Sequence, residues 1–177
     1  RPTDSVIEYG GGWSSLWWAE RAAWTMTVEA DFQWAAKLLH EFGRRPDLIT
    51  KWELRFAGCE WSHLPTKPKA YWSKHASFLT EKSSRAMEEA YMRIDFDPDI
   101  FVIDGSARPL NAQTIDKHLQ TQDRRCRMVV VDNMETMRPF VAGLFEGFIE
   151  HPFHEYDLQK IPKHQNGKWC TSVFIKG

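Results

Sequence analysis

The chain has 177 residues, of which 42% are hydrophobic, and its 23 Lys and Arg nearly balance its 24 Asp and Glu. This length fits one domain with a substantial core, and the net charge of −1 excludes a broad polyanion-binding surface, which needs many Lys and Arg contacts with phosphate. No apolar run is long enough to cross a membrane, and the three Cys residues lack CxxC spacing, so we expect an intracellular protein, cytoplasmic or nuclear.

The amino-terminal residues predict a loose segment ahead of the folded part. We expect residues 1–12 to form a flexible arm that ends in the hinge Gly10-Gly11-Gly12, and residues 13–177 to form a single globular domain. Because the chain begins with Arg1 rather than Met, we also expect it to be a domain of a larger protein.

Three further elements are predicted from periodicity in the first half of the chain. A helix over 28–42 follows alternating steps of four and three, and a second helix is expected over about 81–93. Residues 48–56 alternate as a half-buried strand that is antiparallel or at a sheet edge. The apolar stripe of the first helix, expected to be buried, is Phe32, Ala35, Leu39 and Phe42.

The central stretch predicts a parallel βαβ unit. The runs 100–103 and 128–131 are rich in β-branched residues, as strands buried on both faces are, and each is followed by an aspartate. A helical pattern over 112–120 lies between them. A helix from Pro139 and a last strand over 168–175 complete the chain. The pattern predicts a single α/β or mixed α+β domain with helices packed on a mixed central sheet.

Asp104 and Asp132 end these two strands and are expected at the same carboxyl-terminal edge, where ligands of open α/β sheets bind. Two such carboxylates can hold Mg or Mn, which suggests an Asp-dependent, metal-assisted phosphoesterase or nuclease. The structural alternative is that Asp132 caps a helix with Glu135 as its reciprocal partner, while Asp104-Gly105 forms a turn.

Nine Trp residues are the other unusual feature, since Trp is enriched at interfaces and binding pockets. No complete catalytic set and no GxGxxG or P-loop motif is present. The favoured function is therefore a non-catalytic recognition module without a cofactor. Its ligand would be a nucleotide-like group, a nucleic-acid strand or a protein partner, held where Trp52 and Trp72 meet Arg124 and Arg125.

A set of short motifs over about residues 72–127 resembles a divergent WWE domain. In chain order they are Trp72, Phe78, Met87-Glu88-Glu89-Ala90-Tyr91, Ile115-Asp116, Leu119, Gln122 and Arg124-Arg125-Cys126-Arg127. That family wraps a half-barrel on one helix and binds the iso-ADP-ribose unit of poly(ADP-ribose). The resemblance thus implies an ADP-ribose-like ligand at Tyr91, Gln122 and Arg125. It also requires Ile115-Asp116 to lie in a strand, where the periodicity predicts a helix.

Overall fold

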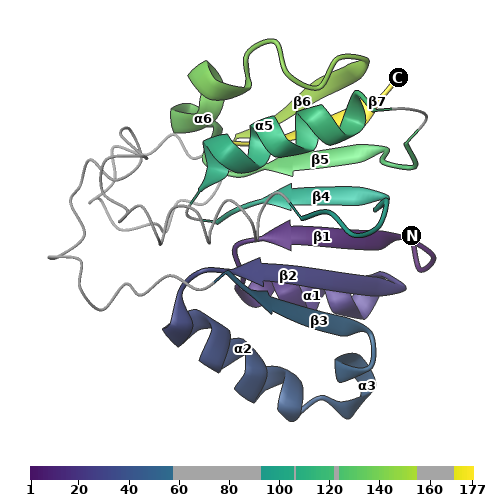
Figure 1. The fold of residues 1–177 in the computed structure, drawn as a ribbon, viewed down its shortest axis with the longest axis vertical. Coiled ribbons are helices and arrows are strands. Elements are labelled where there is room, and N and C mark those ends of the chain that lie inside the picture. Colours follow the sequence, from purple (N-terminus) through teal and green to yellow (C-terminus); the bar gives the residue numbers. More distant parts are fainter. Residues whose placement is uncertain (58–92, 106, 122–123, 155–169) are drawn as a thin grey trace, which may run out of the picture.

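The computed structural model describes residues 1–57, 93–105, 107–121, 124–154 and 170–177. They form a seven-stranded sheet in the order β3-β2-β1-β4-β5-β7-β6 (Figure 1). Neighbours among β1 to β5 are parallel, whereas β7 runs antiparallel to β5 and to β6. This confirms the predicted domain with a mixed central sheet. The strands are β1 Ser5–Tyr9, β2 Trp24–Glu29, β3 Trp52–Phe56, β4 Ile100–Ile103, β5 Met128–Val131, β6 Phe148–His154 and β7 Cys170–Lys176.

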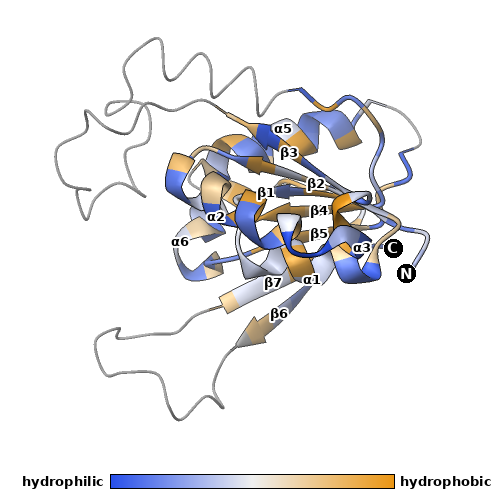
Figure 2. Ribbon diagram, turned by 90° about the horizontal axis from the view of Figure 1, so that it is seen from below, coloured by the Kyte–Doolittle hydropathy of each residue, from blue (hydrophilic) through white to orange (hydrophobic). Residues whose placement is uncertain are grey.

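Helices cover the two faces of the sheet (Figures 1 and 2). α1 (Trp13–Arg21), α2 (Phe32–Gly43) and the short α3 (Pro46–Ile49) lie on one face, and α5 (Arg108–Leu119) and α6 (Met134–Val141) lie on the other. Each face has its own core, because the parallel strands are apolar on both sides. None of the helices in the described ranges is long and apolar enough to span a bilayer.

The expected flexible arm over residues 1–12 is wrong. Residues 5–9 form β1, which pairs with β2 on one side and β4 on the other, and Val6, Ile7 and Tyr9 are buried. The glycines that suggested a hinge instead form the turn between β1 and α1. A five-residue strand is short, and its burial depends on neighbours that are distant in sequence.

The helix predicted over 28–42 begins later than expected. Residues 24–29 form β2, and the Asp31 side chain caps α2 by accepting hydrogen bonds from the backbone N–H groups of Gln33 and Trp34. Phe32, expected in the core, is 69% exposed, and Leu39 is exposed as well. Phe42 is buried as predicted. The β-branched residues before Asp31 favour the strand over an added helical turn.

The other predicted elements are placed as follows. The strand expected over 48–56 is shorter, since Pro46–Ile49 is α3, and β3 is an edge strand that runs parallel to β2. The central unit β4-α5-β5 is confirmed. Pro139 lies inside α6 rather than at its start, and 148–154 is strand. The helix predicted over 81–93 lies almost entirely outside the described residues.

Candidate active site at the carboxyl edge of the sheet

The strand order reverses direction between β1 and β4, and the loops that follow these two strands touch. Gly10 has φ of +95°, and a Cβ built there would lie 2.2 Å from the Cα of Gly105. The backbone N–H of Asp104 donates to the carbonyl of Tyr9 at 2.8 Å. Only glycine fits such a close approach at this angle. Open α/β sheets bind ligands at the carboxyl ends of the strands at such a reversal.

The turn after β1 leads directly into α1 and leaves its backbone close to the end of β2. The N–H of Gly11 donates to Glu29 Oε2 at 2.7 Å, and a Cβ on Gly11 would lie 2.3 Å from Cδ1 of Leu38. α1 then begins at Trp13. A glycine turn that opens a helix presents N–H groups and a positive helix end to a ligand.

Glu29 ends β2 beside this turn and is only 5% exposed. Its Oε1 accepts the N–H groups of Ala30 and Asp31, both at 2.7 Å. Burial raises the pKa of Glu29, although these backbone hydrogen bonds oppose the shift. A carboxylate has about four acceptor positions, so Glu29 retains capacity for a ligand hydroxyl beyond its three N–H partners. It follows Gly10 by 19 positions, the spacing at which an acidic residue holds ribose hydroxyls in dinucleotide-binding sheets.

The buried carboxyl group of Glu8 holds the glycine turn in place. It is fully buried on β1, where it accepts hydrogen bonds from the hydroxyls of Ser15, on α1, and Thr27, on β2. Burial raises the pKa of Glu8 to about 7. This carboxyl therefore ties β1, α1 and β2 together around the glycine turn.

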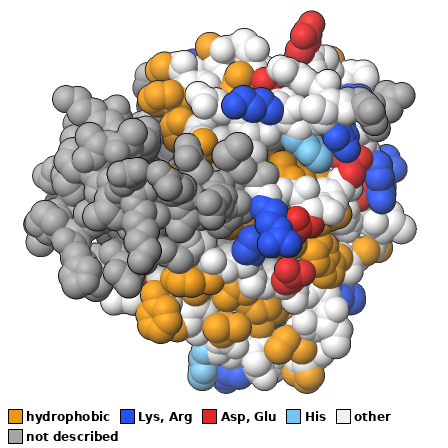
Figure 3. All heavy atoms as spheres, viewed as in Figure 1, with side chains coloured by type: hydrophobic (Ala, Val, Ile, Leu, Met, Phe, Trp, Pro, Cys, Tyr) orange, Lys and Arg blue, Asp and Glu red, His pale blue; other side chains and the backbone are white. Residues whose placement is uncertain are grey.

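Two aromatic rings flank the Glu29 side of the edge. Phe56 is the register partner of Glu29 on β3, and its ring contacts that of Phe32 edge to face, with centroids 6.3 Å apart. Phe32 and Phe56 are 69% and 44% exposed. Figure 3 shows hydrophobic side chains gathered on this lower part of the molecule, over α2 and the edge of the sheet. The rings are available to a planar ligand group.

On the other side of the reversal, Asp104 and Asp132 lie at the same edge, as the sequence predicted. Their carboxylates converge on one point, and Nη2 of Arg108 occupies it, donating to Asp104 Oδ1 at 2.7 Å and to Asp132 Oδ2 at 3.3 Å. Asp132 Oδ1 accepts from the Thr171 hydroxyl at 2.9 Å. The N-cap residue of α6 is Asn133, so Asp132 is not the helix cap considered above. Burial and the charge of Asp132 raise the pKa of Asp104 to about 6.

The ligand residues expected from the Trp and Arg pattern do not gather at one site in the described part of the chain. Trp52 is buried and stacks on Phe42 with centroids 3.7 Å apart, so it offers no open platform. Arg125 pairs with Asp99 at 3.1 Å, next to the start of β4 and thus at the opposite edge. Trp72, Tyr91 and Gln122 lie outside the described residues. The residues Ile115-Asp116, which the WWE resemblance requires in a strand, lie in α5.

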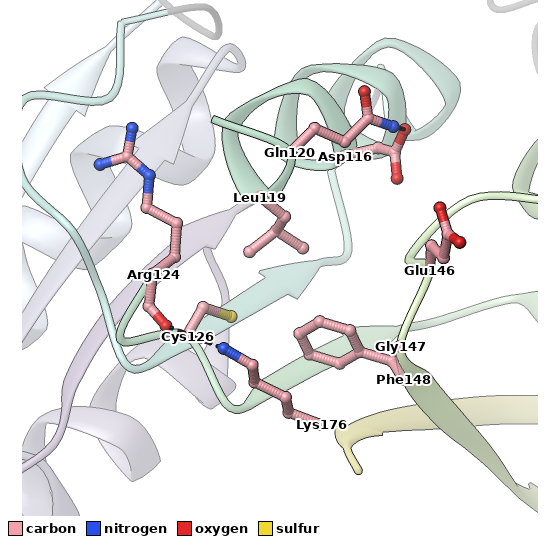
Figure 4. Close-up of a pocket in the computed structure, with 9 residues that line it drawn as sticks. All are labelled: Asp116, Leu119, Gln120, Arg124, Cys126, Glu146, Gly147, Phe148 and Lys176. Carbon is pink, nitrogen blue, oxygen red and sulfur yellow. Dashed lines mark hydrogen bonds between the residues drawn. The ribbon is translucent and has the colours of Figure 1, made fainter. Parts of the chain in front are cut away.

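Arg124 borders a cavity of about 350 Å³ at this opposite, amino-terminal edge (Figure 4). Its guanidinium donates to the His118 carbonyl at 3.3 Å. Asp116 and Lys176 also line the cavity, and Phe148 contributes an apolar wall. The cavity is separated from the glycine turn by the length of the strands, so it forms a different site.

The sequence matches no protein-family model, and no curated protein is a recognisable relative. Solved structures do resemble the fold. The O-methyltransferase TomG of Streptomyces achromogenes, in complex with SAM, has a TM-score of 0.55 at 16% identity, over 99% of this chain and 74% of its own. An rRNA methylase of Streptococcus thermophilus has a TM-score of 0.52 at 12% identity, over 98% and 87%. Spermidine synthase of Thermotoga maritima has a TM-score of 0.56 at 10% identity, over 99% and 54%. The present chain spans less than two thirds of the length of the synthase and of some other proteins with a similar structure.

These likenesses correct the functional expectations. The fold is that of the O-methyltransferase TomG and of the rRNA methylase, and this contradicts both the expected non-catalytic recognition module for an ADP-ribose-like ligand and its phosphoesterase or nuclease alternative. The expectation of no cofactor, or of Mg or Mn, is likewise contradicted, because TomG is in complex with SAM. A nucleotide-like ligand agrees with these neighbours, whereas a protein partner and a parent protein find no support in them.

Glu8, the glycine turn and Glu29 were not predicted as site residues from the sequence. A detectable signal existed: the apolar run Val6-Ile7, then Glu8, then three glycines, then a helix, with an acidic residue about 20 positions further on. Gly10 and Gly12 match the first two glycines of GxGxxG, but Ser15 stands where the motif has its third, so the full motif is not present.

Proposed function

We propose that the chain binds S-adenosylmethionine at the carboxyl edge of β1 and β2 and catalyses methyl transfer. The observation that carries the proposal is the junction of Gly10, Gly11 and Glu29 at the reversal of the β3-β2-β1-β4-β5-β7-β6 sheet. The likeness of the fold to TomG and to the rRNA methylase supports it.

The residues present fit the parts of this cofactor. Gly10 and Gly11 let the turn pack against Gly105 and Leu38, where a side chain would collide, and beside Gly12 the nearest atom to an added Cβ is Ser14 Oγ at 3.8 Å, which leaves space there for a ligand. Glu29 supplies a carboxylate for the ribose hydroxyls, and the exposed rings of Phe32 and Phe56 supply apolar surface for adenine. When bound, the cofactor supplies a methyl group on a positively charged sulfur.

The proposal is tested by calorimetric titration with S-adenosylmethionine and with S-adenosylhomocysteine. We expect the wild type to bind both, and Glu29→Ala to weaken both at least about tenfold, because hydrogen bonds to charged groups contribute ~1.5–3 kcal/mol. Glu20→Ala, on the solvent side of α1 in the same half of the molecule, is the matched control and should bind as the wild type does.

NAD, which shares the ribose and adenine, serves as the competing ligand in the same titration. Binding of NAD in preference to S-adenosylhomocysteine, or no binding of either S-adenosyl compound by the wild type, would contradict the proposal.

A further inference from the structure

Three side-chain oxygens converge on a single nitrogen at the β4 and β5 half of the edge. Nη2 of Arg108 lies 2.7 Å from Asp104 Oδ1, 2.8 Å from Asn133 Oδ1 and 3.3 Å from Asp132 Oδ2. The Arg108 side chain is only 7% exposed, whereas those of Asp104 and Asp132 are 40% and 26% exposed. The positive charge is thus held beneath the carboxylates, which face outward.

This arrangement resembles a binding site for a divalent metal ion in which the guanidinium of Arg108 occupies the position of the ion. Carboxylate and amide oxygens that meet at one point are the ligands of Mg²⁺ and Mn²⁺. Here Arg108 fills that point, four residues after Asp104 and at the first position of α5, which begins beside the carboxyl ends of β4 and β5 (Figure 1). The guanidinium is a permanent charge, because arginine is not deprotonated in proteins.

The net charge of Asp104, Asp132 and Arg108 restricts which ligand groups can bind next to them. Two carboxylates and one guanidinium leave one net negative charge, so a carboxylate or phosphate group is repelled from this position. A neutral or cationic group with an N–H or O–H is attracted, since Asp104, the most exposed of the four side chains, accepts hydrogen bonds. The contact between Gly10 and Gly105 places Asp104 directly beside the glycine turn.

We propose that Arg108 takes the place of a divalent cation at the methyl-acceptor end of the site, where it positions Asp104 to receive a hydroxyl or an uncharged amine as the nucleophile, on a substrate that is neutral or carries its positive charge on another group. This inference rests on the proposed methyl transfer. With the cofactor bound, the nitrogen or oxygen of the acceptor would bond to the methyl carbon, the carbon–sulfur bond would break with its electron pair on sulfur, and the acceptor's proton would pass to Asp104. Arg108 is a positioning residue, because it acts through the carboxylates.

The first test uses Mn²⁺ alone, with the electron paramagnetic resonance signal of the free ion as the readout. The wild type and Arg108→Lys, which keeps the internal cation, should leave the signal unchanged at millimolar Mn²⁺. Arg108→Ala should bind Mn²⁺ at least about tenfold more tightly, because three oxygens then lack their cation. The double variant Arg108→Ala, Asp104→Asn should lose that binding.

Wild-type binding of Mn²⁺ that Asp104→Asn abolishes would overturn the inference, as would a folded Arg108→Ala variant that binds none. If Arg108→Ala does not fold, Arg108→Gln removes the charge while keeping much of the side-chain volume and takes its place. Titration with S-adenosylhomocysteine on the same samples separates the two proposals: no binding by the wild type is a failure of the proposed function, whereas normal binding with the wrong Mn²⁺ result is a failure of this inference.

The second test addresses the acceptor class, with ethanolamine and acetate as probes added to the S-adenosylhomocysteine complex. Ethanolamine should shift the backbone amide resonances of Asp104 and Asn133, acetate should not, and Asp104→Asn should abolish the response. Larger shifts with acetate, or shifts with neither probe, would contradict the proposed acceptor class.

Discussion

The carboxyl edge of the sheet has two halves that are built from different groups. At the β1 and β2 half, the backbone dominates: Gly10 meets the backbone of Gly105, and Glu29 accepts hydrogen bonds from three backbone N–H groups. At the β4 and β5 half, charged side chains dominate, with Arg108 between two aspartates. Backbone atoms suit the binding of a ligand that is always the same molecule, because substitutions leave their positions unchanged. Side chains can differ from one protein to another, so they suit the recognition of a ligand that differs as well. In our account the first half holds the cofactor and the second half the methyl acceptor.

The largest effect is expected from a substitution that disrupts the backbone contact between Gly10 and Gly105, which joins the two halves. Gly10→Ala should lower the free energy of unfolding by ~3 kcal/mol, because its methyl group meets Gly105 and its φ of +95° is strained. Gly143→Ala is the matched control: its φ is +80°, but no atom lies within 4 Å of the new Cβ, so only the strain of ~1 kcal/mol is expected. Urea denaturation measures both. Equal losses would show that the contact with Gly105 contributes nothing.

The buried carboxyl of Glu8 should give the β1 half a pH dependence. The folded-state pKa of about 7 lies above the ordinary 4.5, so between these values the folded protein keeps a proton that the unfolded chain has lost. Stability attributable to Glu8 is therefore present below pH 4.5 and declines as the pH rises to 7, by ~3 kcal/mol. Glu8→Gln should remove this part of the decline in denaturation curves taken across that range. Parallel curves for the wild type and Glu8→Gln would contradict the assignment.

Removing the positive charge of Arg108 should change the free energy of unfolding by less than the substitutions at Gly10 and Glu8 do. Arg108→Met leaves Asp104 and Asp132 without their shared partner, and because water reaches both carboxylates we expect a loss of ~2 kcal/mol rather than the larger cost of a fully buried pair. Arg45→Met, which removes an exposed arginine paired with Asp47 and Glu20, should lower the free energy of unfolding by less than Arg108→Met does, because water screens exposed ion pairs. Thermal unfolding at neutral pH compares them, and a smaller loss for Arg108→Met than for Arg45→Met would count against the cluster.

The smallest effect on stability is expected at Phe32. Because its ring is mostly exposed, Phe32→Ala should change the free energy of unfolding by less than ~0.5 kcal/mol. It should nevertheless weaken S-adenosylhomocysteine binding severalfold, since base–aromatic contacts contribute ~1–3 kcal/mol. Leu39→Ala removes another exposed apolar side chain of α2 and should leave the affinity unchanged. Equal affinities of the two variants for S-adenosylhomocysteine would show that Phe32 does not contact the ligand.

The sequence predicted the β4-α5-β5 unit and the approach of Asp104 to Asp132 because both depend on local patterns and on the fixed hand of parallel crossovers. It did not predict β1, whose five residues owe their burial to strands up to nearly a hundred positions away. It also missed Arg108, since nothing in the sequence distinguishes an arginine on a solvated helix from one that points back into a site. Phe32 was placed in the core because the helical period alone does not fix where a helix begins.

The division of the edge is tested most directly by hydrogen exchange with and without S-adenosylhomocysteine, read by mass spectrometry. We predict slower exchange in the peptides that span 9–13 and 29–33, at the glycine turn and the end of β2. Protection confined to 119–127 and 146–149, around the cavity at the amino-terminal edge, or no protection anywhere, would contradict it.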